Sequence, residues 1–202
     1  TGLDERSNEN CKGLEKSVET LSTILKNEHE TTSLPYSRMM LVGFSQGGAL
    51  SLFTGFALPE QLAGIVLLSG YLPAASKFKV TPGLESTPVL HCHGTQDLLV
   101  NHSLAKKSKQ QVQSQHGVQD YTIKSYNIGH TVSMDELNDV LEFVKLRLPD
   151  DPSFRIHLKD PSTMSVKELK AAIRRAGLSS AGCFEKSEFV RLLQEHREKS
   201  EL

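Results

Sequence analysis

Four short runs of strand length alternate along the chain with segments of helical periodicity. Three of them, residues 38–44, 62–70 and 87–94, are apolar, as expected for buried strands. The fourth, 120–126, alternates apolar with polar residues before it breaks at an Asn-Ile-Gly turn. Strands that alternate with helices form a parallel sheet with helices on both faces. The pattern therefore predicts an α/β fold for most of the chain.

The helical segments lie before, between and after these strands. Residues 14–25 carry apolar side chains at helical spacing, 102–117 form a polar helix that ends at Gly117, and 134–148 form an amphipathic helix. Residues 71–86 contain two prolines and no periodicity, so we expect an irregular excursion there.

The pattern changes after residue 148. Residues 149–164 are rich in proline and charge, which is typical of a linker. Ser165 and Glu168 then have capping-box spacing, Gly177 ends the first short helix, and a second apolar stripe follows. We predict an α/β domain over 1–148, a linker over 149–164 and an all-α helix–loop–helix module over 165–202.

Candidate chemistry begins at the end of the first strand, where residues 43–47 read Gly-Phe-Ser-Gln-Gly. A serine between two such glycines, after a strand and before a helix, has the context of a nucleophile elbow. The glycines indicate a turn too tight for side chains on either side of Ser45. The alternative is a glycine-rich turn that carries an ordinary surface serine.

A nucleophilic serine needs a base, and the base needs a third group to orient it. Asp97 follows the strand that breaks at Gly94, and His130 follows the strand over 120–126. Both therefore lie where reactive groups gather in parallel sheets, at the carboxyl ends of strands. The remaining histidines are at positions that fit this role poorly: His29, His91, His93, His102, His116, His157 and His196. We predict Ser45, Asp97 and His130 as a catalytic triad.

A metal site is the alternative use of histidine in this chain. His91 and His93 form an H-x-H pair, but no carboxylate or cysteine cluster accompanies it. We expect no metal and no cofactor, and we interpret Cys92 between the two histidines as a small buried hydrophobe.

Four segments in order, "GFSQGGALSL", "LAGIVLLSGYLP", "HCHGTQDLLV" and "IGHTVSMDEL", resemble the acyl-protein thioesterase and carboxylesterase family, which is also described as lysophospholipase-like. The resemblance covers roughly residues 1–148 and implies the α/β-hydrolase fold. It implies a serine hydrolase that removes fatty acyl groups from protein cysteines (depalmitoylation), or cleaves related esters, through an acyl-enzyme. Ser45 would be the nucleophile, His130 the general base and acid, and Asp97 the orienting carboxylate.

The same resemblance assigns binding groups and marks two departures. The backbone N–H of Gln46 would supply half of the oxyanion hole, and Tyr71, Leu72 and Pro73 would form a substrate wall. Asn101 stands where the family usually has proline. Family members also carry at least two strands before residue 1, including a His-Gly turn with the second oxyanion donor. We therefore expect an amino-terminally incomplete hydrolase domain. The source of the second oxyanion donor, the activity of the printed chain and the presence of a targeting segment stay open.

The last segment resembles the SAP-like carboxy-terminal module of the mesencephalic astrocyte-derived neurotrophic factor family. Ser180 stands where that module often has the first cysteine of a C-x-x-C motif, so we expect no redox role. From residue 157 onward there are nine Lys and Arg against seven Asp and Glu, a net charge of +2. This small excess argues against nucleic-acid binding and favours a protein-docking or structural module.

The composition of the whole chain indicates where in the cell the protein is expected. The net charge is −1, the three cysteines are scattered, and no apolar run is long enough to span a membrane. We expect a reducing, cytoplasmic location. Two readings stay open: a serine hydrolase, acting on acyl-proteins, lysophospholipids or small esters, and a non-catalytic scaffold with a docking or nucleic-acid-binding tail. The intact trio of Ser45, Asp97 and His130 favours the first.

Overall fold

The computed structural model describes residues 11–154 and 159–200. Contacts divide the chain into two compact units between Phe154 and Arg155. Each unit has a hydrophobic core of its own.

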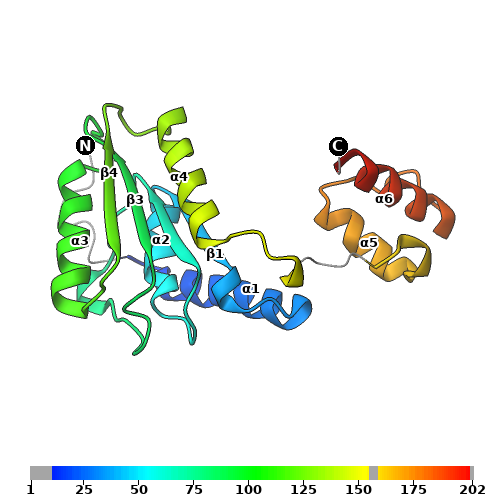
Figure 1. Cartoon of the computed structure of the whole chain (residues 1–202), viewed down its shortest axis with the longest axis horizontal. Helices are drawn as coiled ribbons and strands as arrows, with labels where there is room; N and C mark the ends of the chain where they lie inside the picture. Colours follow the sequence, from blue (N-terminus) through cyan, green and yellow to red (C-terminus); the bar gives the residue numbers. More distant parts are fainter. Residues whose placement is uncertain (1–10, 155–158, 201–202) are drawn as a thin grey trace. The chain divides into compact units, whose positions relative to one another are not determined.

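The first unit contains a sheet of four parallel strands (Figure 1). They are β1 (Met40–Phe44), β2 (Gly64–Leu68), β3 (Val89–Gly94) and β4 (Tyr121–Tyr126), and they lie in chain order. Because the strands are parallel, their carboxyl ends lie at the same end of the sheet. The parallel α/β sheet predicted from the sequence is confirmed, with β1 and β4 at its edges.

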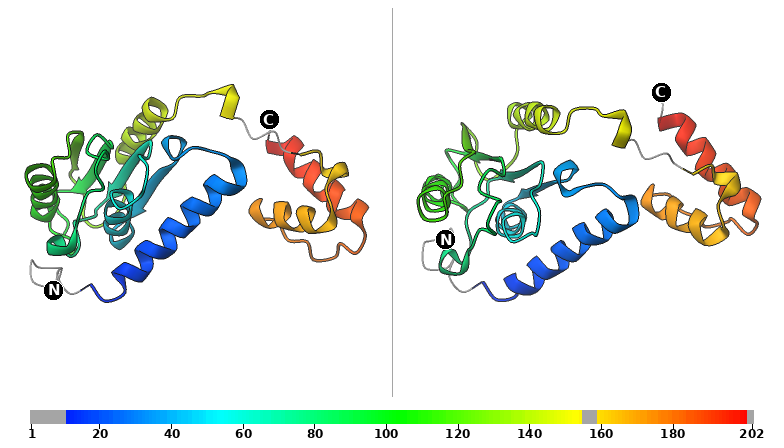
Figure 2. Two further views of the ribbon diagram at one scale, coloured as in Figure 1. Left: turned by 90° about the horizontal axis from the view of Figure 1, so that it is seen from below. Right: turned by 60° about the horizontal axis from the view of Figure 1, so that its bottom comes forward.

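Helices cover both faces of this sheet. Helices α1 (Leu14–Thr32), α2 (Gln46–Gly55) and α3 (His102–His116) contribute to the core on one face, and Figure 2 shows α1 alongside α2. Helix α4 (Met134–Arg147) packs Val140 and Phe143 on the other face. Short 3₁₀ turns lie at Tyr36–Arg38, Ala75–Lys77 and Pro152–Phe154.

Local sequence explains where two of these helices begin and end. The side chain of Asn101, the residue that departs from the family's proline, caps α3 by accepting a hydrogen bond from the Ser103 N–H. Gly117 ends α3 in the left-handed conformation, at the predicted position. Ser133 and Glu136 form a capping box at the start of α4. These caps place the loops after β3 and β4, which precede α3 and α4.

The second unit is a pair of helices, α5 (Val166–Arg175) and α6 (Lys186–Ser200), preceded by a 3₁₀ turn at Pro161–Thr163. The capping box of Ser165 and Glu168 is present as predicted. Composition placed residues 161–164 in the linker, but Pro161 and Met164 are buried in this unit, because Asp160 caps the turn and Met164 packs into the core. Among the described residues, no helix has the length and apolarity to cross a membrane.

A substitution in the small core of the second unit tests whether this unit folds independently of the first. Leu169 is fully buried there. Leu169→Ala should lower the free energy of unfolding of the second unit by about 2–5 kcal/mol, which is as much as a core of this size supplies. Amide hydrogen exchange should then lose protection in residues 159–200 and keep it in 11–154. Val166→Ala, at a position that is 40% exposed on the same helix, is the control and should change neither. Lost protection throughout 11–154 would show that the two cores do not fold independently.

Candidate active site

Ser45 lies in the sharp turn between β1 and α2. Its backbone has φ 54° and ψ −119°, a conformation that L-residues rarely adopt. The Ser45 N–H donates to the Leu68 carbonyl at 2.7 Å, which ties the turn to the end of β2. The turn has the geometry of a nucleophile elbow, in which the strained residue presents its hydroxyl above the sheet.

Close backbone packing permits this turn, but only one of the two flanking glycines takes part. A Cβ on Gly43 would lie 2.3 Å from the carbonyl carbon and oxygen of Gly47, and one on Gly48 would lie 2.8 Å from the Gly43 carbonyl oxygen. A Cβ on Gly47 would meet no atom within 4 Å. The expectation that both flanking positions exclude side chains is therefore wrong for Gly47. The second crowded position is Gly48.

The structure brings the three predicted residues together. His130 Nε2 lies 3.0 Å from Ser45 Oγ, and His130 Nδ1 lies 2.7 Å from Asp97 Oδ2. An ionised carboxylate only accepts, so His130 Nδ1 carries a proton and, in the neutral ring, Nε2 is free to accept from the Ser45 hydroxyl. The Phe44 ring packs against His130, with 4.8 Å between the ring centroids.

Asp97 is a buried carboxylate whose hydrogen bonds keep it ionised. Its side chain is fully buried, and its Oδ1 accepts from the N–H groups of Leu99 and Val100 at 2.9 and 2.8 Å. Burial by itself raises the pKa of Asp97, but these bonds and the bond from His130 outweigh it, and the pKa is lowered overall. The carboxylate can therefore stabilise a positive charge on His130.

A glycine also brings the loops of Asp97 and His130 together. A Cβ on Gly94 would lie 2.3 Å from the Ile128 carbonyl oxygen and 2.5 Å from that of Gly129. The Gln96 N–H donates to the same Ile128 carbonyl at 3.0 Å. The loops after β3 and β4 thus make backbone contact directly beside the Asp97–His130 pair.

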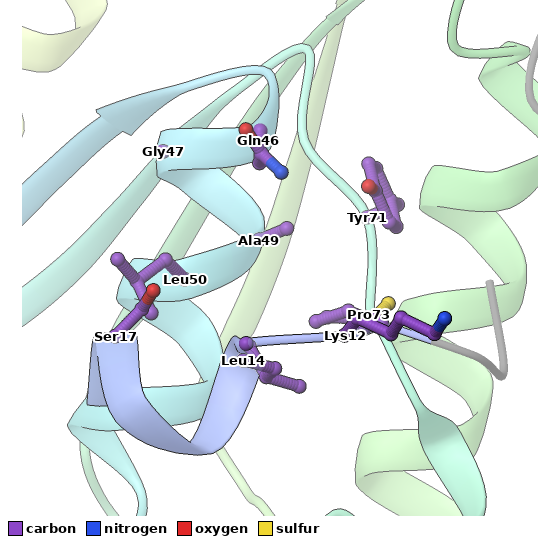
Figure 3. Close-up of a pocket in the computed structure, with 11 residues that line it drawn as sticks. Lys12, Leu14, Ser17, Gln46, Gly47, Ala49, Leu50, Tyr71 and Pro73 are labelled. Carbon is purple, nitrogen blue, oxygen red and sulfur yellow. The ribbon is translucent and has the colours of Figure 1, made fainter. Parts of the chain in front are cut away.

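A pocket of about 460 Å³ lies next to the elbow (Figure 3). Gln46, the first residue of α2, lines it with Gly47, so the N-terminal N–H groups of that helix lie at one side. Tyr71 and Pro73, two of the predicted wall residues, also line it. The rest of the lining comes from the residues just before α1, from the first turn of α1 and from α2: Cys11, Lys12, Gly13, Leu14, Ser17, Ala49 and Leu50.

Leu72, the third predicted wall residue, does not line this pocket, and sequence reasoning missed the part played by α1. Leu72 is only 4% exposed, packs in the core beneath α1–α3, and donates its N–H to Ser108 Oγ at 2.8 Å. It therefore belongs to the core and does not line the pocket. The contribution of residues 11–17 depends on how α1 packs against α2, and no motif in that segment indicated it.

His91, His93 and Cys92, the residues of the alternative metal site, are buried in the interior. His91 and His93 are fully buried and contact each other, with 3.2 Å between His91 Nε2 and His93 Nδ1. Within the described part of the chain, no group of three or more His, Cys, Asp or Glu side chains is placed to hold a metal ion. Cys92 is fully buried, as expected, and burial raises the pKa of its thiol to about 11.

Comparison with known proteins also divides the chain in two, with a boundary between residues 148 and 159. Residues 1–148 match the phospholipase/carboxylesterase family, and residues 159–199 match the ARMET C-terminal family. Acyl-protein thioesterase 1 homolog 1 of Dictyostelium discoideum is 36% identical over 148 residues, which are 73% of this chain and 65% of that protein. Acyl-protein thioesterase 1 of Candida albicans is 32% identical over 139 residues, or 66% and 60% of the two chains. The chain thus spans less than two thirds of the length of these relatives.

Solved structures show the same fold. The crystal structure of Arabidopsis thaliana SOBER1 is 28% identical, has a TM-score of 0.61, and is matched over 73% of this chain and 68% of that chain. Zea mays acyl-protein thioesterase 2 is 24% identical with a TM-score of 0.59, over 73% and 70% of the two chains, a likeness of fold alone.

The two glycines of the elbow can be told apart by their effects on stability. Gly43→Ala should destabilise the first unit by about 3 kcal/mol or more, because the new Cβ overlaps the backbone of α2. Gly47→Ala should be neutral or stabilise by up to about 1 kcal/mol, because alanine favours the helix and the position is open. Thermal and urea unfolding measure both. Equal losses of stability in the two variants would contradict this packing.

Proposed function

The chain belongs to the phospholipase/carboxylesterase family, and on this premise we propose that it is a serine hydrolase that cleaves fatty-acyl thioesters on protein cysteines through an acyl-enzyme. The observation that carries the proposal is the imidazole of His130, hydrogen-bonded to Ser45 Oγ on one nitrogen and to Asp97 on the other. A scaffold that only binds other proteins has no need for all three groups in this order.

In the proposed acylation step, Ser45 Oγ attacks the carbonyl carbon of the substrate while its proton passes to His130 Nε2. Asp97 stabilises the resulting imidazolium, because its carboxylate is buried and already bonded to Nδ1. The Gln46 N–H donates to the oxyanion of the tetrahedral intermediate, an interaction worth about 10²–10³-fold in kcat for one donor. The intermediate then collapses, its C–S bond breaks, and His130 gives its proton to the leaving thiolate, which departs as a thiol.

Deacylation repeats these steps with water. His130 takes a proton from the water molecule, the hydroxide attacks the acyl group on Ser45, and the collapse of the second intermediate restores the serine hydroxyl. The fatty acid leaves as a carboxylic acid. Every proton moves within the Ser45–His130 pair or between His130 and water or the leaving group, so these steps require no cofactor.

The proposed substrate is an S-acylated protein. The pocket beside Ser45 has polar groups as well as the apolar side chains of Leu14, Leu50 and Pro73, and the apolar part suits an acyl chain. The two relatives compared above are named acyl-protein thioesterases, and their names support the same class of substrate. A lysophospholipid or a small ester would place a similar acyl group in the same pocket and differ in the leaving group.

We also propose a cellular location for the protein and a role for the second unit. The three cysteines are few and scattered along the sequence, and we propose a reducing, cytoplasmic location. We propose that the second unit docks to a protein partner. Phe184 is 90% exposed in the loop between α5 and α6, and the balanced charge of this segment gives little attraction for nucleic acid.

The triad can be tested by kcat on a p-nitrophenyl ester. Ser45→Ala and His130→Ala should each lower kcat by about 10⁴-fold or more, and Asp97→Asn by up to about 10⁴-fold, with the fold retained by circular dichroism. His102→Ala is the control, since His102 bonds only to Ser125 among the hydrogen bonds described, at 2.9 Å, and should stay within a few-fold. A larger loss in His102→Ala than in His130→Ala would show that the wrong base is assigned.

The substrate class can be tested by narrowing the pocket. Leu50→Trp should lower kcat/KM for a palmitoyl-cysteine peptide at least about tenfold and leave an acetyl ester nearly unchanged, because only the long chain needs the space. Leu146→Trp, at a position that is 71% exposed on α4, is the control. Faster turnover of lysophosphatidylcholine than of the palmitoyl peptide by the parent protein would overturn the proposed substrate.

A further inference from the structure

A line of buried hydrogen bonds leads from β4 to the loop that carries Asp97. The Tyr121 hydroxyl lies 2.9 Å from His91 Nδ1, His91 Nε2 lies 3.2 Å from His93 Nδ1, and His93 Nε2 lies 2.8 Å from the Val100 carbonyl oxygen. Tyr121 is 3% exposed and both histidines are 0% exposed. None of these three side chains takes part in the mechanism described above.

The Val100 carbonyl at the end of this line determines the direction of the bonds between the three side chains, and His91 also has a backbone hydrogen bond with Gly70, which raises its pKa against the larger effect of burial. A carbonyl oxygen only accepts, so His93 Nε2 must carry a proton. In neutral His93 the bare Nδ1 then accepts from His91 Nε2–H, and the bare Nδ1 of His91 accepts from the Tyr121 hydroxyl. Burial lowers the pKa of His93, lowers that of His91 to about 3 and raises that of Tyr121, so all three are neutral near pH 7.

The same directions exclude the H-x-H metal site. A histidine binds a metal through a nitrogen lone pair. In this line the lone pair of His91 is used by Tyr121, and the lone pair of His93 is used by His91. Neither ring has a nitrogen free for a metal unless the buried line is broken.

The line ends on the residue that also supports Asp97. Val100 donates its N–H to Asp97 Oδ1 at 2.8 Å and accepts from His93 at its carbonyl, so it is held on both sides. His93 Nε2 also lies 3.5 Å from Asp97 Oδ2, the oxygen that bonds to His130. His93 therefore contacts the backbone that supports the carboxylate and lies beside the oxygen that orients the base.

We propose that His93 is a positioning residue of the triad, which keeps Asp97 Oδ2 on His130 by holding Val100, and that Tyr121 and His91 keep His93 in the required tautomer. This inference rests on the proposed function. If His93 is lost, the Val100 carbonyl is left without its partner in a buried site, and the 97–100 loop shifts to find another. A shift of about 1 Å at Asp97 would turn His130 away from Ser45, and misplacement of this size lowers rates by up to about 100-fold.

The tautomers can be measured without any activity. Long-range ¹H–¹⁵N correlation spectra of the imidazole rings in the full chain near pH 7 should show His91 and His93 both neutral and both protonated at Nε2. Protonation of His93 at Nδ1, or a charged His93 ring, would overturn the proposed line. Because this readout does not depend on turnover, it holds even if the hydrolase assignment fails.

Variants of His93 test its effect on the triad. His93→Leu removes the donor and should lower kcat for a p-nitrophenyl ester about 10- to 100-fold with KM within about twofold. His93→Gln can place an amide N–H near the position of Nε2 and should recover kcat to within about fivefold of the parent. Val89→Ala, a fully buried change at the far end of the same strand, is the control for lost packing and should lower the Tm without lowering kcat.

Two further results complete the test. Tyr121→Phe removes the first donor of the line and should lower kcat about two- to tenfold, which keeps the proposal testable if His93→Leu does not fold. Unchanged kcat in His93→Leu, or a loss in Val89→Ala of the same size, would show that His93 has only a structural role. A parent protein without turnover would count against the proposed function, and the tautomer measurement would then decide on His93.

Discussion

The close approach of α2 to β1 at Gly43 and Gly48 is the contact on which the site depends. Because neither residue carries a Cβ, the backbone of the helix can pack against the end of the strand that it has just left. This contact forces Ser45 into its strained conformation, and the bond from its N–H to Leu68 holds it there. Gly94 permits an equivalent contact between the loops after β3 and β4. One glycine contact therefore places Ser45, and the other places Asp97 and His130.

Burial of a carboxylate is the main energetic cost of this arrangement, and local hydrogen bonds offset it. Asp97 would be expensive to ionise in the interior without donors. Two backbone N–H groups and the His130 ring supply them, and His93 directs its own N–H to the same loop. The loop also joins the pocket wall, since the Val100 side chain packs with Ala49 and Tyr71. The orientation of His130 and the shape of the pocket are thus coupled through one short segment.

Much of the fold and the meeting of Ser45, Asp97 and His130 could be predicted, because both follow from local rules. Periodicity indicates strands and helices, and a parallel sheet aligns the loops that follow its strands. What could not be predicted depends on packing between distant segments. The inward turn of Leu72 and the place of residues 11–17 in the pocket depend on how α1 and α3 pack, and the burial of Met164 depends on α6. The contact of His91 with Tyr121 depends on the register of β3 against β4, which periodicity does not reveal.

The proposed mechanism requires that Ser45 carries an acyl group during turnover, and intact-protein and peptide mass spectrometry can detect that group. The protein is mixed with a palmitoyl thioester in excess and quenched in acid within its first turnovers. We expect a mass gain of one palmitoyl group that maps to the peptide containing Ser45 and is absent from Ser45→Ala. Turnover with the acyl group on another residue, such as Cys11 in the neighbouring pocket, or turnover in Ser45→Ala at the parent rate, would contradict it.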